Sequence, residues 1–97
     1  MHVLPAAQKY IDALPANRYS AIVADIEDMK IGRFDRVRTK QLLGEIRELI
    51  SGRHRISYFS IDSALYFVRG FPKKSAKTPR NEIEYAEKVL KMMKRGI

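Results

Sequence analysis

The stretch from residue 55 to residue 71 constrains the fold of this chain most strongly. Two runs rich in aromatic and β-branched residues, Arg55–Ile61 and Ala64–Phe71, are separated only by Asp62-Ser63. Such runs favour extended strands, and a short polar connection between them is typical of a hairpin turn. We therefore expect an antiparallel β-hairpin over these residues.

The second run of this hairpin carries apolar side chains on both of its faces. Strict alternation divides the run into two sets, which are Leu65, Phe67, Arg69 and Phe71 on one face and Tyr66 and Val68 on the other. A strand that is apolar on both faces needs helices over at least one of them. An α+β layered fold follows.

The N-terminal third shows helical spacing of apolar residues. One short helix is expected over Pro5–Leu14, with a proline in its first turn and Pro15 as its stop. A stronger one begins with Asn17 as its cap and ends at Gly32. These two segments predict a helical hairpin.

The remaining segments are a C-terminal helix and one ambiguous stretch. Thr78-Pro79 supplies a cap and a first-turn proline, so we expect the last helix to begin there. Between Thr39 and Ile50 the apolar spacing fits both a helix and a strand, although Gly44 weakens the helix option.

Length and composition limit the class of protein. The 97 residues predict one domain, spanning 1–97, because folding units cluster at ~100–150 residues. The chain has no cysteine, which removes disulfides, thiolate metal sites and thiol nucleophiles. No apolar run approaches the ~20 residues of a membrane span, and the N-terminus lacks a signal-peptide pattern. We expect a soluble, cytoplasmic protein without a membrane partner.

Positive charge is concentrated in two blocks. The chain has 19 Lys and Arg against 11 Asp and Glu, a formal net charge of +8. Residues 30–55 contain eight bases and three acids, and residues 69–80 contain five bases and no acid, so each block carries +5. Clustering of one sign is typical of proteins that bind a polyanion such as RNA or DNA. An acidic protein surface is the other class of partner that fits.

The sequence lacks the residues that several kinds of chemistry require. The sequence has no glycine-rich phosphate loop and no Cys or His pair at metal-ligand spacing, so we expect no metal and no small-molecule cofactor. His54 lies between Arg53 and Arg55, and these cations favour the neutral imidazole that a general base requires. A histidine in such a position is more often an exposed turn residue without a functional role than a general base.

The basic residues of the expected sheet and of the loop after it form the strongest candidate site. Arg47, Arg55 and Arg69 sit beside apolar strand residues, where a cation needs a cleft, a carboxylate or a phosphate as neighbour. An ion pair with a nearby glutamate is the structural alternative. The candidate cluster is Arg47, Arg53, Arg55, Tyr58, Arg69, Lys73, Lys74 and Lys77.

Such a cluster suits RNA cleavage by the RNA's own 2′-hydroxyl. That reaction needs a base near the 2′-oxygen, cations on the pentavalent phosphate and an acid for the leaving 5′-oxygen. Arg and Lys supply the charge, and Tyr, Lys or His can move protons when neighbouring cations lower their pKa values.

The C-terminal half resembles the phage-derived HigB-type branch of the RelE toxin superfamily. The matching motifs are Glu45-Ile46-Arg47, Arg55-Ile56-Ser57-Tyr58-Phe59, Gly70-Phe71-Pro72-Lys73-Lys74, Lys77-Thr78-Pro79 and Glu82-Ile83-Glu84-Tyr85-Ala86, in this order. The resemblance implies a RelE-like α+β fold, with a helical hairpin on a small antiparallel sheet and a C-terminal helix. It also implies that the ambiguous stretch from Gly44 to Ile50 is a strand. Residues 1–3 leave almost no room for the edge strand with which family members open.

The resemblance further implies a function. It points to the toxin of a type II toxin–antitoxin system, an mRNA endonuclease (mRNA interferase) that acts at the ribosome and is neutralised by a helix-turn-helix antitoxin. The catalytic candidates are Arg47, His54, Arg55, Tyr58 and Arg69. The candidates for RNA or phosphate binding are Arg53, Lys73, Lys74, Lys77 and Arg80. The alternatives are a non-catalytic RNA- or DNA-binding module and an inactivated toxin that mainly binds its antitoxin.

Overall fold

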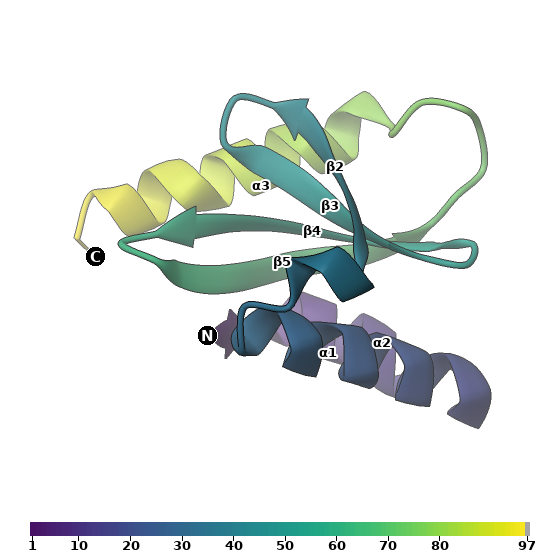
Figure 1. Ribbon diagram of the computed structural model, residues 1–97. Helices are drawn as coiled ribbons and strands as arrows, with labels where there is room; N and C mark the ends of the chain where they lie inside the picture. The colour runs from purple at the N-terminus through teal and green to yellow at the C-terminus, as the bar shows by residue number, and fades with distance from the viewer. Residues whose placement is uncertain (97) are drawn as a thin grey trace.

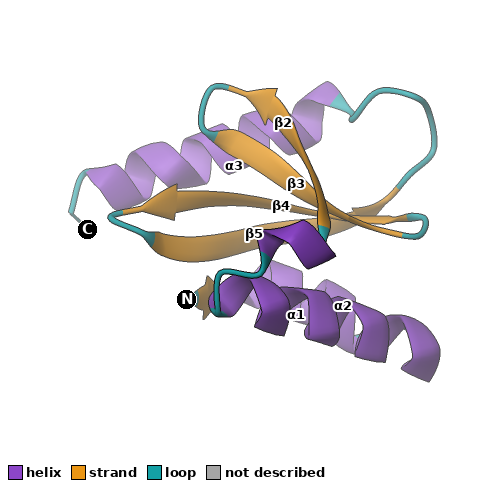
Figure 2. Cartoon of the chain, viewed as in Figure 1, coloured by secondary structure: helices purple, strands orange, loops and turns teal. Residues whose placement is uncertain are grey.

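The protein is described by a computed structural model that covers residues 1–96. Three helices and five strands follow one another with a single 3₁₀ turn between them (Figures 1 and 2). In chain order they are β1 (His2–Val3), α1 (Pro5–Asp12), α2 (Ala16–Lys30), the 3₁₀ turn η1 (Phe34–Arg36), β2 (Arg38–Leu43), β3 (Ile46–Ser51), β4 (His54–Ile61), β5 (Ala64–Pro72) and α3 (Arg80–Lys94).

Helices cover both faces of one five-stranded sheet, whose strand order is β1-β5-β4-β3-β2. The α1–α2 hairpin lies under one face and α3 crosses the other (Figure 1). The core between the hairpin and the sheet consists of Ala7, Ile11, Ile22, Ile26, Met29, Leu49, Ile56, Tyr58 and Phe67. The core under α3 consists of Ile46, Phe59, Val68, Ala86 and Leu90. Each large apolar side chain buried here contributes roughly 1.5–3 kcal/mol, and the expected α+β layering is confirmed.

The β4–β5 hairpin forms where the sequence predicts it. Asp62 and Ser63 have φ values of 50° and 69°. Positive φ at both central residues defines the tight turn whose twist matches that of paired strands. The hairpin brings Arg55 opposite Phe71 and Ile56 opposite Gly70.

A β-bulge changes which face the residues of β5 occupy. The β4–β5 register shifts between Ser57 and Tyr58, which pair with Arg69 and Phe67. Val68 has no partner in this register, and the shift breaks strict alternation. Phe67 consequently packs under the α1–α2 hairpin, whereas Arg69 pairs with Glu82 of α3. The expectation that Leu65 and Phe67 share one face with Arg69 and Phe71 is therefore wrong.

The ambiguous stretch resolves into two strands. Residues 46–51 form β3, as the resemblance implied, and residues 38–43 form β2 as well. Gly44 has a φ of 54° in the turn between them, a value that glycine adopts more readily than other residues. A helix is excluded because the chain reverses at this glycine.

The N-terminus adds a parallel strand. His2 and Val3 pair with Tyr66 and Phe67 of β5, so the sheet is mixed rather than wholly antiparallel. The Leu4 backbone N–H donates to the Phe67 carbonyl at 2.9 Å. The expectation that residues 1–3 leave almost no room for an edge strand is corrected, because two residues suffice for this pairing.

Two predicted helix caps are also wrong. The second helix begins at Ala16, so Asn17 lies inside its first turn and makes no side-chain cap. The last helix begins at Arg80, with Pro79 at the cap position. Thr78 instead donates its hydroxyl to Glu48 of β3 at 2.8 Å. Thr78 thus binds a loop to the sheet.

Close packing of α1 on β5 requires Gly70. A Cβ at position 70 would lie 2.8 Å from the Tyr10 Cβ and closer still to the Tyr10 ring. We predict that Gly70→Ala lowers the free energy of unfolding by about 1–3 kcal/mol, because an overpacked core must shift backbone. Urea denaturation measures this loss. In a Tyr10→Ala background the same substitution should cost less; equal losses in the two backgrounds would contradict this explanation.

Candidate functional site

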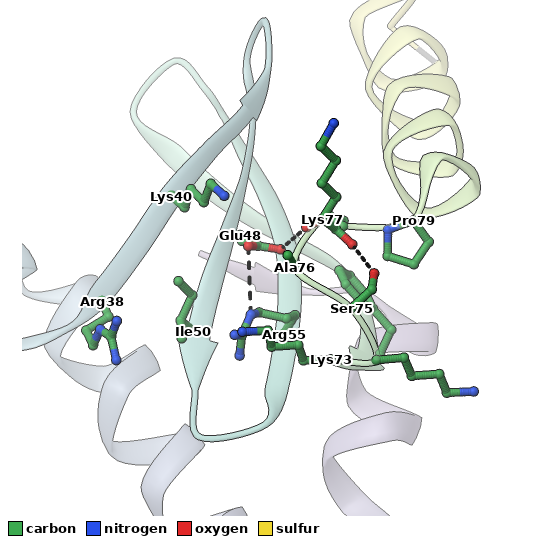
Figure 3. A pocket seen from close by; sticks show the side chains of 13 residues that line it. Arg38, Lys40, Glu48, Ile50, Arg55, Lys73, Ser75, Ala76, Lys77 and Pro79 are labelled. Atoms are coloured by element: carbon green, nitrogen blue, oxygen red, sulfur yellow. Dashed lines mark hydrogen bonds and ion pairs between the residues drawn. The ribbon is translucent and has the colours of Figure 1, made fainter.

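A basic cleft lies on the α3 side of the sheet, beyond the start of that helix. It has a volume of about 240 Å³ and is bounded by β2, β3, β4 and the loop that joins β5 to α3 (Figure 3). Its lining residues are Arg38, Lys40, Glu48, Ile50, Arg55, Phe71 and residues 73–79. Among them are six cationic side chains, from Arg38, Lys40, Arg55, Lys73, Lys74 and Lys77.

The floor of the cleft is a buried ion pair. Glu48 is 3% exposed and Arg55 is 9% exposed, and the Arg55 Nε lies 3.8 Å from a Glu48 carboxylate oxygen. The Arg55 Nη1 donates to the backbone carbonyls of Gly52 at 2.8 Å and His54 at 3.1 Å. The guanidinium is therefore held rigidly beneath the cleft, and the adjacent carboxylate partly compensates its charge.

The loop over the cleft is tied down at both ends. Its first residue, Lys73, donates its backbone N–H to the Arg53 carbonyl at 2.7 Å. At the other end the Thr78 hydroxyl donates to the second oxygen of Glu48. Between these anchors Lys73, Lys74 and Lys77 are exposed. Within residues 1–96 none of these three lysines forms an ion pair.

An open groove continues the cleft toward the β3–β4 turn. Its volume is about 700 Å³, and it shares Arg38, Arg55, Lys73 and Lys74 with the inner cleft. Arg53 joins the lining here, which gives the groove five cationic side chains and, over the part of the chain described, no carboxylate. Clustered cations with few compensating acids produce a positive potential that attracts a polyanion.

Arg47 and Tyr58 lie on the opposite face of the sheet. Tyr58 is 3% exposed and belongs to the core under the helical hairpin. The Arg47 Nε donates to the Tyr58 hydroxyl oxygen at 3.3 Å, and the Arg47 Nη2 donates to the Thr39 hydroxyl oxygen at the same distance. Both candidates are therefore separated from the cleft by the sheet itself.

His54 also faces the helical hairpin. Its Nδ1 lies 2.7 Å from the Tyr10 hydroxyl. Burial, followed by the charges of Arg18 and Arg55, lowers the pKa of His54. Burial raises the pKa of Tyr10, so its hydroxyl keeps its proton, and it forms a hydrogen bond with Nδ1 of the neutral imidazole. The histidine thus links α1 to the start of β4.

Arg69 and Arg80 are held by α3 outside the cleft. The Arg69 Nε donates to Glu82 at 2.8 Å, and its guanidinium lies 3.9 Å above the centre of the Tyr85 ring. Arg80 is exposed and pairs with Glu84 one turn later in the helix. Of the predicted site residues, the cleft and its groove bring together Arg53, Arg55, Lys73, Lys74 and Lys77.

Sequence reasoning missed three charged residues of the cleft, Arg38, Lys40 and Glu48. Arg38 and Lys40 are two positions apart in β2, and this spacing sends both side chains to one face of a strand. Recognising residues 38–43 as a strand was the signal needed to find them. Glu48 is one of the glutamates close in sequence to Arg47, and the sequence suggests no more for it than an ion pair; its position at the floor depends on the β3–β4 register.

The fold is similar to that of a chain in a solved structure. A chain of the crystal structure of the archaeal RelE–RelB complex from Pyrococcus horikoshii OT3 matches with a TM-score of 0.62 and 16% identity, covering 77% of this chain and 94% of that chain. Among curated proteins, no match is found. The architecture is therefore that of a RelE-like protein.

The family model gives a more specific assignment than the fold does. The family model for phage-derived Gp49-like proteins (DUF891) matches residues 9–91, and the chain belongs to this family. The phage-derived family and the RelE-like fold that the resemblance implied are both confirmed. In the described residues, no helix is long and apolar enough to cross a membrane. Over the same residues no three His, Asp or Glu side chains are grouped so that they could hold a metal ion.

The Tyr10–His54 contact predicts a pH dependence of stability. Because folding lowers the pKa of His54, the unfolded chain takes up a proton first as the pH falls through about 6.5. The free energy of unfolding should therefore fall between pH 7.5 and the folded-state pKa. His54→Asn keeps a hydrogen-bonding side chain beside Tyr10 and should lose this component in urea denaturation. An unchanged pH dependence in the variant would refute the assignment.

Proposed function

We propose that this protein is the toxin of a type II toxin–antitoxin system, of the HigB type, and that it cleaves mRNA at the ribosome. The observation that carries the proposal is the cleft, in which exposed cations surround a rigidly held arginine. Membership of a phage-derived family and the RelE-like fold support it. The proposed partners are mRNA, the ribosome and a helix-turn-helix antitoxin in the cytoplasm.

In this proposal the cations bind the scissile phosphate and stabilise the charge that develops on it. Arg55 lies at the floor and presents a fixed guanidinium, whose planar fork suits phosphate oxygens. Lys73, Lys74 and Lys77 approach from the loop, while Arg38 and Lys40 approach from β2. Preorganised charge of this kind is often the largest single contribution to catalysis.

In this proposal, the residues that transfer protons in the cleft differ from those that the sequence predicts. Tyr58 and His54 face the helical hairpin, whereas Glu48 lines the cleft. We assign Glu48 as the base that takes the proton from the 2′-hydroxyl. The 2′-oxygen then attacks phosphorus, the bond to the 5′-oxygen breaks, and a lysine ammonium of the loop protonates that oxygen. The products are a 2′,3′-cyclic phosphate and a 5′-hydroxyl.

A non-catalytic RNA-binding module is the second candidate. The observation that favours it is the position of three expected catalytic side chains: Arg47 and Tyr58 contact each other on the far face, and Arg69 pairs with Glu82. In such a module the groove would track the nucleic-acid backbone, and affinity would fall gradually as single charges are removed. A toxin that mainly binds its antitoxin would behave in the same way.

Induced expression in a bacterium tests the proposed function. We predict growth arrest with new mRNA 5′ ends inside translated frames. The triple variant Lys73→Ala, Lys74→Ala, Lys77→Ala should reduce these cuts by at least about a hundredfold, because exposed lysines stabilise the transition-state charge.

Arg55→Ala should abolish the cuts, but it leaves Glu48 buried without its cation. Arg55→Lys is the safer variant, since it keeps the charge and loses only the planar fork.

The matched control removes the same charge elsewhere. Lys9, Lys30 and Lys91 are exposed on the three helices, and replacing all three by alanine should leave growth arrest intact. Absence of arrest and of cuts with a folded, expressed wild-type protein would overturn the endonuclease. Equal loss in both triple variants would show that net charge alone matters.

The role of Glu48 gives a separate prediction. Glu48→Gln keeps an oxygen that accepts from Thr78 but removes the base. Its single-turnover cleavage rate should fall by about 10²–10⁴-fold, with RNA affinity nearly unchanged. A variant that cleaves at the wild-type rate would refute this role.

A further inference from the structure

Thr78 stands apart from the rest of its loop. Over residues 72–80, Thr78 alone is partly buried, and the others are exposed. A residue before a proline is biased toward extended backbone, so Thr78 stays outside α3, and Pro79 takes the cap position of that helix. The Thr78 hydroxyl instead donates to the Glu48 Oε1 at 2.8 Å, although the two residues are 30 positions apart in the chain.

The two carboxylate oxygens of Glu48 have different neighbours. Oε1 accepts from Thr78, whereas Oε2 lies 3.8 Å from the Arg55 Nε, which is beyond hydrogen-bond distance. Among residues 1–96, Thr78 is the only one whose side chain donates a hydrogen bond to this carboxylate. Figure 3 shows the carboxylate between Arg55 and the loop. Oε2 therefore keeps its lone pairs for a group that enters the cleft.

A glutamate carboxylate needs a directional contact to hold one orientation. The torsion that rotates it is broad and roughly two-fold, so the side chain does not fix the carboxylate plane by itself. The ion pair with Arg55 restrains the position of Glu48 but lacks the directionality of a hydrogen bond. A general base must place one oxygen within about 2.6–3.2 Å of the group whose proton it takes. The Thr78 bond supplies the missing constraint.

The same hydroxyl also anchors the loop, which is a separate effect. The Ser75 hydroxyl donates to the Lys77 carbonyl at 2.9 Å and braces the loop internally. Lys77 lines the cleft directly before Thr78. Loss of the Thr78 hydroxyl would therefore loosen a cation at the rim as well as the carboxylate at the floor, and an experiment has to separate the two.

We propose that Thr78 is a positioning residue of the cleft, whose hydroxyl orients the Glu48 carboxylate for proton abstraction from the 2′-hydroxyl of RNA. Thr78 itself does not touch the substrate in this role. The inference rests on the proposed function and on Glu48 as its base. Its failure is distinguishable from theirs when the wild-type chain and Glu48→Gln are measured beside the Thr78 variants.

Single-turnover cleavage of mRNA on ribosomes, at saturating protein, tests the role with two substitutions. Thr78→Val keeps the β-branched shape and loses the hydroxyl. Its rate should fall by about 10–100-fold, because a small misplacement of a catalytic group is costly. Thr78→Ser keeps the hydroxyl and should cleave within about threefold of the wild-type rate. The affinity for uncleavable 2′-O-methyl RNA should change by less than about twofold in both variants, since no charge is removed.

The matched control removes a hydroxyl from the opposite face of the sheet. Thr39 is also partly buried, and its hydroxyl accepts from the Arg47 Nη2 at 3.3 Å. Thr39→Val should cleave at the wild-type rate. Equal losses in Thr39→Val and Thr78→Val would overturn the assignment, and so would a Thr78→Val defect that appears in RNA affinity with the saturated rate unchanged.

A double variant shows whether the hydroxyl acts through the carboxylate. In the Glu48→Gln background the base is already absent, so Thr78→Val should lower the residual rate by less than about twofold. A further loss as large as that in the wild-type background would show that Thr78 acts through the loop lysines, and it would overturn the proposal.

The carboxyl carbon resonance of Glu48 tests the contact without any cleavage. It should move in Thr78→Val, return toward its wild-type position in Thr78→Ser and stay in place in Thr39→Val; an unmoved resonance in Thr78→Val would overturn the proposal. A folded wild-type chain that cleaves no RNA would overturn the proposed function and this role with it. Cleavage that requires Glu48 but is unaffected by Thr78→Val would overturn the role of Thr78 alone.

Discussion

The basic cleft depends on incomplete coverage of one face of the sheet. The strands send apolar side chains to both faces, so each face requires a cover. The α1–α2 hairpin covers one of them, whereas α3 packs over Ile46, Phe59 and Val68 at one end of the other. The remaining end carries Glu48, Arg55 and Phe71, and the loop of residues 73–79 lies beside it. The cleft is the space that α3 leaves uncovered.

The electrostatics of the cleft follow from this position. Arg55 is buried, and burial of a lone guanidinium would be costly, so Glu48 and two backbone carbonyls lie around it. The cations at the rim remain in water and need no such partners. Their mutual repulsion would be relieved by a bound polyanion, such as the RNA of the proposed function.

Local sequence patterns were sufficient for most of the secondary structure. The β4–β5 hairpin, the helical hairpin and the last helix were expected near their observed bounds, because turn residues and apolar spacing act over a few positions. The errors arose where long-range pairing overrides local preference. The bulge beside Ser57 turns Arg69 toward α3, and Thr78 binds Glu48 instead of capping a helix. Glu82, which binds Arg69, and Glu48, which binds Thr78, are not sequence neighbours of these residues.

The sequence by itself determined the charge, the RelE-like α+β fold and the basic loop, since composition and short motifs carry these properties. Only the tertiary structure decided which cations share one surface. It combined Arg55 with the loop lysines and with Arg38 and Lys40, and it placed Arg47, Tyr58 and His54 across the sheet. The physical reason is that side chains alternate along a strand, so a single bulge or a change of register moves a residue to the opposite face.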